Sequence, residues 1–225
     1  KILKEMQQAY DGFAFSIKNI MNDAKKNPEL NSRIEGVVAQ LISMDAKYET
    51  AIETALGQSM QNIVTKNEDD AKYIIDYLKR MRYGRITFLP MSAIKPRSID
   101  QRFERSLNTS GCFGVASDLV RYEDKYDGIV RGLLGNTVIV DNIDTAVRLA
   151  RATGYGFKIV TLEGEVVSPS GAITGGSKKN DIANIFSHGR ELGELETIVK
   201  KLSDEIALLN VRKEKCSDEI DAAQN

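Results

Sequence analysis

Histidine and cysteine are almost missing from this sequence. Its 225 residues contain a single histidine, His188, and two cysteines, Cys112 and Cys216. Two cysteines so far apart are too few for a disulfide framework or a zinc site, and their scarcity favours a reducing cytoplasm. His188 has no second ligand or activated nucleophile in its pattern, so it indicates neither a metal centre nor a catalytic role.

An excess of charge of one sign and a long apolar run are also missing. The net charge is −1, which gives no overall attraction to nucleic acid or to a membrane, so any nucleic-acid contact would have to be local. No apolar run approaches the length of a membrane span, and no signal peptide is visible. Because the chain begins at Lys1 without a methionine and ends inside a helical pattern, we expect a fragment of a longer protein.

A glycine-rich stretch, PSGAITGGSKK at 169–179, has the residue types of a phosphate-binding loop but not their order. A P-loop needs a lysine directly after its second glycine and a hydroxyl after that lysine. Here Gly176 is followed by Ser177 and then Lys178, and the lysine pair is followed by Asn180. The sequence therefore predicts no nucleotide cofactor.

The spacing of the other polar residues does not predict an enzyme either. No nucleophile lies in a pattern that would pair it with a base. Asp141, Asn142 and Asp144 follow an apolar run, where they fit a turn and a helix cap better than a cation site. We expect no catalytic residue, no metal, no cofactor and no small-molecule substrate.

Apolar residues at heptad spacing mark both ends of the chain. The N-terminal series stops before Pro28 and fits either a coiled-coil arm or an ordinary amphipathic helix lying on a core. The C-terminal series is longer, has a polar interruption at Lys213, and is flanked by charged residues. Two such helices around one globular region can pair only antiparallel, so we expect Ile17 and Ile20 to face Leu192 and Leu195. The two series are Leu3, Met6, Tyr10, Phe13, Ile17 and Ile20, and then Leu192, Leu195, Val199, Leu202, Ile206, Leu209, Cys216 and Ile220.

The middle of the chain repeats itself. The stretch GVVAQLISMDAKYETAIETALG at 36–57 resembles GVASDLVRYEDKYDGIVRGLLG at 114–135, at a constant offset of 78 residues. A repeat of this length indicates a duplicated supersecondary unit and not a solenoid. Each unit reads strand–helix–strand–helix–strand, and a hairpin near 166–173 follows the second unit.

The predicted elements give an α+β fold, with two pseudo-repeated mixed α/β subdomains at the tip of an antiparallel intramolecular coiled coil. In the first unit we expect strands at 37–42, 63–65 and 85–89, a helix at 46–56, and a second helix that Asn67 caps and Gly84 ends. In the second unit we expect strands at 137–140 and 157–162 and a helix at 145–152. The expected domains are an N-terminal arm at 1–27, subdomain I at 28–90, a connector at 91–110, subdomain II at 111–187 and a C-terminal arm at 188–225.

Three stretches, KYETAIETALG, GRITFLP and LEGEVVSPSGAITGGS, carry a family resemblance. With the duplicated body between heptad arms, they resemble the hinge domain of bacterial structural-maintenance-of-chromosomes (SMC) proteins, over essentially the whole chain. The resemblance implies a homodimer hinge that joins two coiled-coil arms in chromosome condensation and segregation, in the cytoplasm on the nucleoid. It implies no ATPase in this chain, because the heads of the family lie at the far ends of the arms.

The resemblance also places the glycine-rich stretch at the contact between subunits. There a sheet from the second unit of one chain would approach the first unit of its partner, and glycine would allow close backbones or a positive φ. Gly175 and Gly176 also fit a flexible exit into the arm. The candidate interface residues are Gly164, Gly171, Gly175 and Gly176.

Two local basic clusters are candidate contacts for DNA. Lys178, Lys179 and Arg190 lie where the body meets the arm, and the resemblance implies weak, non-specific DNA binding there. The same residues also fit a solvated loop. A second cluster follows a predicted helix, whose C-terminus attracts cations in any case, and consists of Lys79, Arg80, Arg82 and Arg85.

Two other functions stay open from the sequence. One is a nucleotide-binding regulatory or enzymatic α/β domain, against which the order of residues in the glycine loop argues. The other is a monomeric DNA-binding module, which the mass in solution would separate from a dimerisation hinge.

Overall fold

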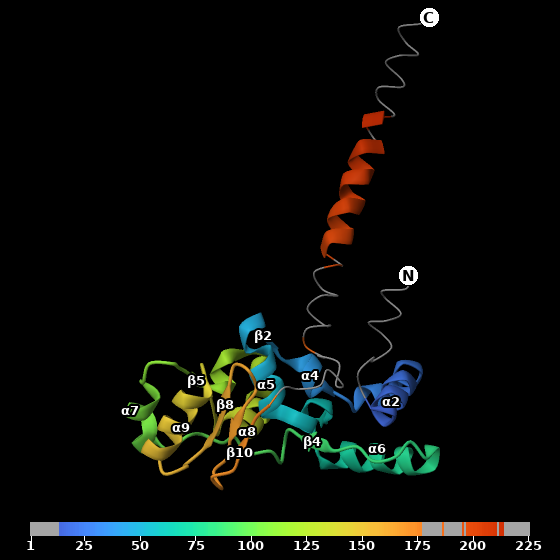
Figure 1. Ribbon diagram of the computed structural model, residues 1–225. Coiled ribbons are helices and arrows are strands. Elements are labelled where there is room, and N and C mark those ends of the chain that lie inside the picture. Colours follow the sequence, from blue (N-terminus) through green and yellow to red (C-terminus); the bar gives the residue numbers. More distant parts are fainter. Residues whose placement is uncertain (1–13, 177–185, 187–194, 196, 211, 214–225) are drawn as a thin grey trace, which may run out of the picture.

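A computed structural model describes residues 14–176, 186, 195, 197–210 and 212–213 of this chain. Figure 1 shows an α/β body and a helix, residues 197–210, that extends away from it. The apolar side chains of this helix are about half exposed, as Leu202 at 52% and Ile206 at 59% illustrate. The N-terminal series from Leu3 to Phe13 lies outside the described residues, as do Leu192, Cys216 and Ile220. Among the described residues, no helix has both the length and the apolar character to cross a membrane.

Subdomain I is built on a three-stranded sheet in the order β1–β3–β4. The central strand β3 (Ile63–Thr65) is antiparallel to β1 (Gly36–Val37) and parallel to β4 (Phe88–Pro90). Three helices that pack on this sheet are α2 (Phe15–Lys26), α3 (Pro28–Ser32) and α6 (Glu68–Met81). Asn67 caps α6 as expected, because its side-chain oxygen accepts a hydrogen bond from the amide of Asp70 at 2.9 Å.

The helix α2 belongs to subdomain I, although its sequence pattern suggested an arm. Its buried residues pack against α3, α6 and one face of the sheet. Ile17 and Ile20 are 3% and 0% exposed in this core, so subdomain I takes up the face that we expected to meet Leu192 and Leu195. A stripe with three- and four-residue spacing does not specify which surface covers it, which is why the sequence could not decide. The core consists of Ile17, Ile20, Met21, Ala24, Leu30, Val37, Ile63, Ile74 and Leu78.

Subdomain II is built on a five-stranded sheet in the order β10–β9–β8–β7–β5. Only the pair β7–β8 is parallel. Asn142 accepts a hydrogen bond from the amide of Thr145 at 3.0 Å and caps α9, so the capping role expected at this turn is confirmed. The elements are β5 (Cys112–Val115), β7 (Thr137–Val140), β8 (Lys158–Thr161), β9 (Val166–Val167), β10 (Ile173–Thr174), α7 (Glu104–Leu107) and α9 (Ile143–Ala152).

The two subdomains repeat one arrangement about an approximate two-fold axis inside the chain. Strands β1, β3 and β4 correspond to β5, β7 and β8, with the same order and the same senses. Near the axis β2 (Ser43–Met44) pairs antiparallel with β6 (Val120–Arg121), and Ser43 lies opposite Arg121, its counterpart in the repeat. The corresponding helices α5 (Glu49–Leu56) and α8 (Asp127–Leu134) also contact each other. One apolar core with residues from both repeats, including Ile52, Leu56, Ile129, Val130 and Leu134, joins the subdomains.

Two expected strands are shorter than the sequence suggested. The run 37–42 is not one strand, because α4 (Val38–Leu41) separates β1 from β2, and in the second repeat the 3₁₀ helix η4 (Ala116–Leu119) takes the same place. A short apolar run fits a strand or a buried helical turn equally well. The strand expected from Arg85 begins only at Phe88. The remaining 3₁₀ helices are η1 (Ala46–Tyr48), η2 (Gly57–Gln61), η3 (Gln101–Phe103) and η5 (Asp124–Tyr126).

Candidate dimer interface and arm root

The glycine-rich stretch folds as a hairpin at the edge of the five-stranded sheet. Ile173 of β10 lies opposite Val167 of β9, and the amide of Gly171 donates to the carbonyl of Ser168 at 2.9 Å to close the turn. Gly171 and Gly176 have φ angles of +85° and +120°. A Cβ at either would have no other described residue within 4 Å, so it is the backbone conformation that favours glycine there.

Gly164 also has a positive φ, +88°, but in a crowded place, whereas Gly175 shows neither feature. A Cβ on Gly164 would come within 2.9 Å of Thr54 Oγ1 and 3.3 Å of Thr50 Cγ2, both on α5. The close approach at Gly164 is therefore made within one chain, between the subdomains. A Cβ on Gly175 would lie 3.6 Å from Glu165 Cγ, which is an ordinary contact, and Gly175 has no left-handed φ. Nothing in the described part of the chain thus requires glycine at position 175.

In the part of the chain that the structure describes, each of the two larger sheets ends in a strand with no further strand beside it, which we call an open edge. β10 is the last strand of its sheet, and Ile173 on it is 56% exposed. β4 is the last strand of the three-stranded sheet. The chain that enters β4 and the helix α6 line a hollow of about 290 Å³, whose walls are Ile75, Leu78, Lys79, Gly84, Arg85 and Ile86. An open edge beside an apolar hollow is a site at which a further strand can add.

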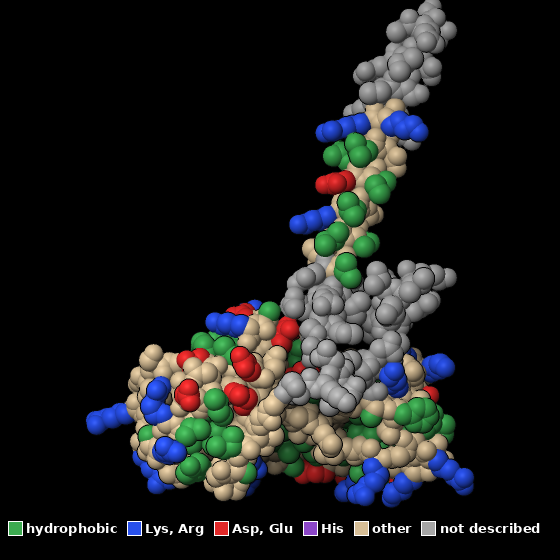
Figure 2. All heavy atoms as spheres, viewed as in Figure 1, with side chains coloured by type: hydrophobic (Ala, Val, Ile, Leu, Met, Phe, Trp, Pro, Cys, Tyr) green, Lys and Arg blue, Asp and Glu red, His purple; other side chains and the backbone are tan. Residues whose placement is uncertain are grey.

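The second basic cluster borders this hollow. Figure 2 shows Lys and Arg side chains gathered at the lower right, over the region of α6 in Figure 1. Lys79 forms an ion pair with Asp76 at 3.3 Å, and the guanidinium of Arg80 lies 5.7 Å from the centroid of the Tyr77 ring. The first cluster, Lys178, Lys179 and Arg190, lies outside the described residues.

The carboxylate of Asp23 on α2 accepts hydrogen bonds from two phenol groups. Tyr77 Oη and Tyr83 Oη donate to Asp23 Oδ2 at 3.0 and 2.7 Å, an arrangement that we call the Asp23 clamp. The hydrogen bond to Asp23 raises the pKa of Tyr83 to about 12, and partial burial adds to the effect. Burial is the larger cause of the raised pKa of Tyr77. The Asp23 clamp could not be predicted from the sequence, because the two tyrosines lie 54 and 60 residues away from Asp23 along the chain.

The Asp23 clamp predicts a loss of stability at high pH. A phenol pKa that folding raises from its ordinary value near 10 gives stability that is present below about pH 10 and lost as the pH rises toward 12. Urea unfolding at pH 9, 10.5 and 12 should show the difference between wild type and Tyr83→Phe shrinking over this range. In an Asp23→Asn background the same substitution should have an effect that varies much less with pH, and an unchanged pH dependence there would contradict the assignment.

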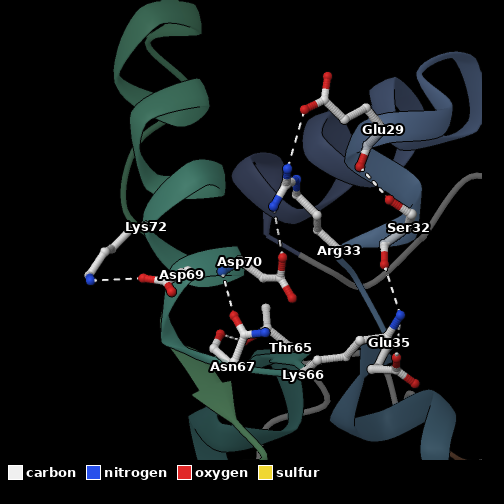
Figure 3. Close-up of polar contacts among 10 residues, drawn as sticks. All are labelled: Glu29, Ser32, Arg33, Glu35, Thr65, Lys66, Asn67, Asp69, Asp70 and Lys72. Carbon is white, nitrogen blue, oxygen red and sulfur yellow. Dashed lines mark hydrogen bonds and ion pairs between the residues drawn. The ribbon is translucent and has the colours of Figure 1, made fainter.

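Charged residues at the carboxyl end of β3 are paired with one another. Figure 3 shows Arg33 between Glu29 and Asp70, at 3.3 and 2.9 Å, which ties α3 to α6. Lys66 reaches the carbonyl of Ser32 at 3.3 Å and Glu35 at 3.8 Å. Because the cations on this face are matched by carboxylates, it offers little net positive charge to a phosphate.

Glu35 also links the two repeats. It accepts hydrogen bonds from Lys125 and Tyr126, each at 3.3 Å, and the contacts with Tyr126 and then Glu35 raise the pKa of Lys125. At the equivalent place across the approximate two-fold axis, Phe113 packs edge-on against Tyr48 with ring centroids 5.7 Å apart. The repeats therefore keep one junction geometry with an ionic contact on one side and an aromatic contact on the other. Among the described residues, no group of histidine, cysteine or acidic side chains could hold a metal ion.

Comparison with known proteins shows the family of this chain. The family model described as "SMC proteins Flexible Hinge Domain" matches residues 31–150, which is more than half of the chain. The chain belongs to the SMC hinge family. A crystal structure of an asymmetric dimer of the Geobacillus stearothermophilus SMC hinge domain is 38% identical with a TM-score of 0.81, and the match covers 93% of this chain and 82% of that one. The Pyrococcus furiosus SMC hinge domain is 35% identical with a TM-score of 0.58, over 78% and 86% of the two chains.

Full-length relatives are similar over nearly the same region. The chromosome partition protein Smc of Halothermothrix orenii is 39% identical over 91% of this chain, and that of Bacillus subtilis is 39% identical over 92%. This chain spans only 17% of the length of either relative. The likeness therefore covers the hinge region of these proteins.

Proposed function

We propose that this SMC hinge domain is a non-catalytic dimerisation module, in which β10 of each copy adds to the β4 edge of the other. The observation that carries the proposal is the pair of open edges in one chain, with an exposed Ile173 on one and an apolar hollow beside the other. Two copies related by a two-fold axis satisfy both edges at once and close a ring with two equal contacts.

The charges beside the two edges are complementary. Glu163 and Glu165 lie in the turn that leads into the β9–β10 hairpin, and Lys79 and Arg85 line the hollow beside β4. Glu165 accepts a hydrogen bond from the Thr161 hydroxyl at 3.0 Å, which holds its carboxylate near Gly175. Opposite charges across the contact favour this pairing of subdomain II with the partner's subdomain I over a pairing of like subdomains.

The mass of the chain in solution tests the proposal. Light scattering over a hundredfold range of concentration should give about twice the mass of one 25.0 kDa chain at the upper end. A monomer at every concentration would rule out the hinge dimer and favour the monomeric DNA-binding module.

In the whole SMC protein, we propose that the dimer joins two coiled-coil arms in chromosome condensation and segregation in the cytoplasm and binds DNA weakly at the arm root. The exposed apolar stripe of the helix at 197–210 supports the arm, and the similarity to chromosome partition proteins supports the setting. The net charge of −1 requires that any DNA contact come from a local cluster, for which Lys178, Lys179 and Arg190 are the candidates.

Charge reversal at the first cluster should weaken DNA binding without changing the dimer. Lys178→Glu with Lys179→Glu should raise the Kd for a short DNA about tenfold or more, with a steep dependence on salt, because phosphate contacts release counterions. Fluorescence anisotropy at two salt concentrations measures the effect. The matched control is Arg80→Glu with Arg82→Glu, which reverses the same number of charges in the second cluster at residues that do not line the hollow beside β4. An equal loss in the control would move the DNA contact to the second cluster.

A further inference from the structure

A short segment of subdomain I, residues 82–86, contacts helix α2 on one side and leads into β4, the edge strand of its sheet, on the other. We call it the junction segment. It starts where α6 ends, with Arg82 in the left-handed conformation at φ 55°. The amides of Arg82 and Tyr83 donate to the carbonyls of Lys79 and Leu78 at 3.3 and 3.2 Å, so the start of the segment is fixed to the helix.

The junction segment contacts α2 at both ends of that helix. Tyr83 joins Asp23 in the last two turns of α2 through the hydrogen bond of 2.7 Å. Gly84 lies against the first turn, because a Cβ on it would come within 2.8 Å of Ser16 Oγ. Two contacts this far apart along one helix set its direction as well as its position.

The same segment forms one wall of the proposed dimer contact. Arg85 and Ile86 line the hollow together with Ile75 and Leu78 of α6. The next residue, Thr87, accepts a hydrogen bond from the amide of Ile63 at 3.1 Å and brings the chain into β4. A strand that adds to β4 would therefore contact the junction segment directly.

We propose that the junction segment couples dimerisation to the docking of α2, and so to the direction in which the N-terminal arm leaves the hinge. This inference rests on the proposed dimer at β4. A second copy on the β4 edge holds residues 85 and 86 in place, and through Tyr83 and Gly84 it holds α2 docked. Coupling between two equilibria is reciprocal. If dimerisation raises the equilibrium constant for docking of α2 by some factor, release of α2 must therefore lower the affinity of the dimer by the same factor.

Hydrogen exchange on the intact chain tests the coupling. The amide hydrogens of α2 should exchange at least about fivefold more slowly in the dimer than in a folded monomer made by Gly175→Val. A factor of about five is the lower limit of the usual coupling between two sites. The double variant Tyr77→Phe with Tyr83→Phe keeps both rings but removes both hydrogen bonds to Asp23. It should reduce this difference and raise the dimer Kd by a similar factor.

The matched control is Tyr122→Phe, which removes a phenol hydrogen bond of 2.9 Å to Asp127 in subdomain II. It should change neither the exchange of α2 nor the dimer Kd. Equal exchange of α2 in wild-type dimer and Gly175→Val monomer would overturn the coupling and leave the dimer standing. A wild-type chain that is monomeric at every concentration would overturn both proposals.

Discussion

Gly175→Val should turn the hinge dimer into a folded monomer. Among the described residues a Cβ at this position makes only an ordinary contact with Glu165, and the backbone is not left-handed. A branched side chain therefore costs little in the isolated subdomain, but it stands between two backbones if β10 adds to a partner strand. We expect the dimer Kd to rise about 30-fold or more, as for a contact worth about 2 kcal/mol, measured by sedimentation equilibrium.

Two comparisons make this result specific. Gly128→Ala adds a Cβ in α8 at an ordinary distance, 3.7 Å from the carbonyl of Ile94, and should leave the dimer unchanged. Gly164→Val should instead lower the melting temperature, because its side chain would collide with Thr54 and Thr50 of the same chain. If Gly175→Val stays dimeric with an unchanged Kd, the contact lies away from the glycine hairpin.

Ile20→Ala should destabilise the whole α/β body. Ile20 is 0% exposed in the core that α2 shares with α3 and α6, and truncating a buried isoleucine leaves a cavity. The free energy of unfolding in urea should fall by about 2–5 kcal/mol. If α2 were only an arm helix, the substitution would affect the arm and leave the unfolding of the body unchanged.

The control for this experiment lies on the same helix. Phe15 is 72% exposed, so Phe15→Ala should change the free energy of unfolding by no more than about 0.5 kcal/mol. If Ile20→Ala also lowered the free energy of unfolding by less than about 0.5 kcal/mol, the result would contradict the assignment of α2 to subdomain I.

Helix caps and a strand that depend on residues close together in the sequence were predicted correctly. Asn67 and Asn142 each cap the helix expected after them, and the strand at 137–140 has the predicted bounds. The duplication gave the order of elements in both subdomains. The burial of α2 on a core was one of two alternatives that the sequence left open, because an apolar stripe does not specify its partner. The helical turn at α4 was missed because a short apolar run fits two structures.

The candidate site was predictable only in part, for the same reason. The resemblance led to the glycine hairpin, and the left-handed backbone at Gly171 and Gly176 gives a physical reason for two of its glycines. The partner surface on the other subdomain could not be read from the sequence. Ile75 and Ile86 come together only when α6 packs beside the chain that enters β4.

The approximate two-fold axis between the repeats has a consequence for how such a chain could have arisen. Because Ser43 pairs with its counterpart Arg121, and α5 contacts its counterpart α8, equivalent positions of the two repeats face each other, as they do when two units associate about a two-fold axis. A single unit with this surface would associate with a second unit at a rate set by its concentration. Joining two units through the connector replaces that encounter by one within a chain, at an effective concentration in the millimolar range for a short linker. Within one chain the pairing of the repeats therefore does not depend on dilution, whereas the proposed pairing between two chains does.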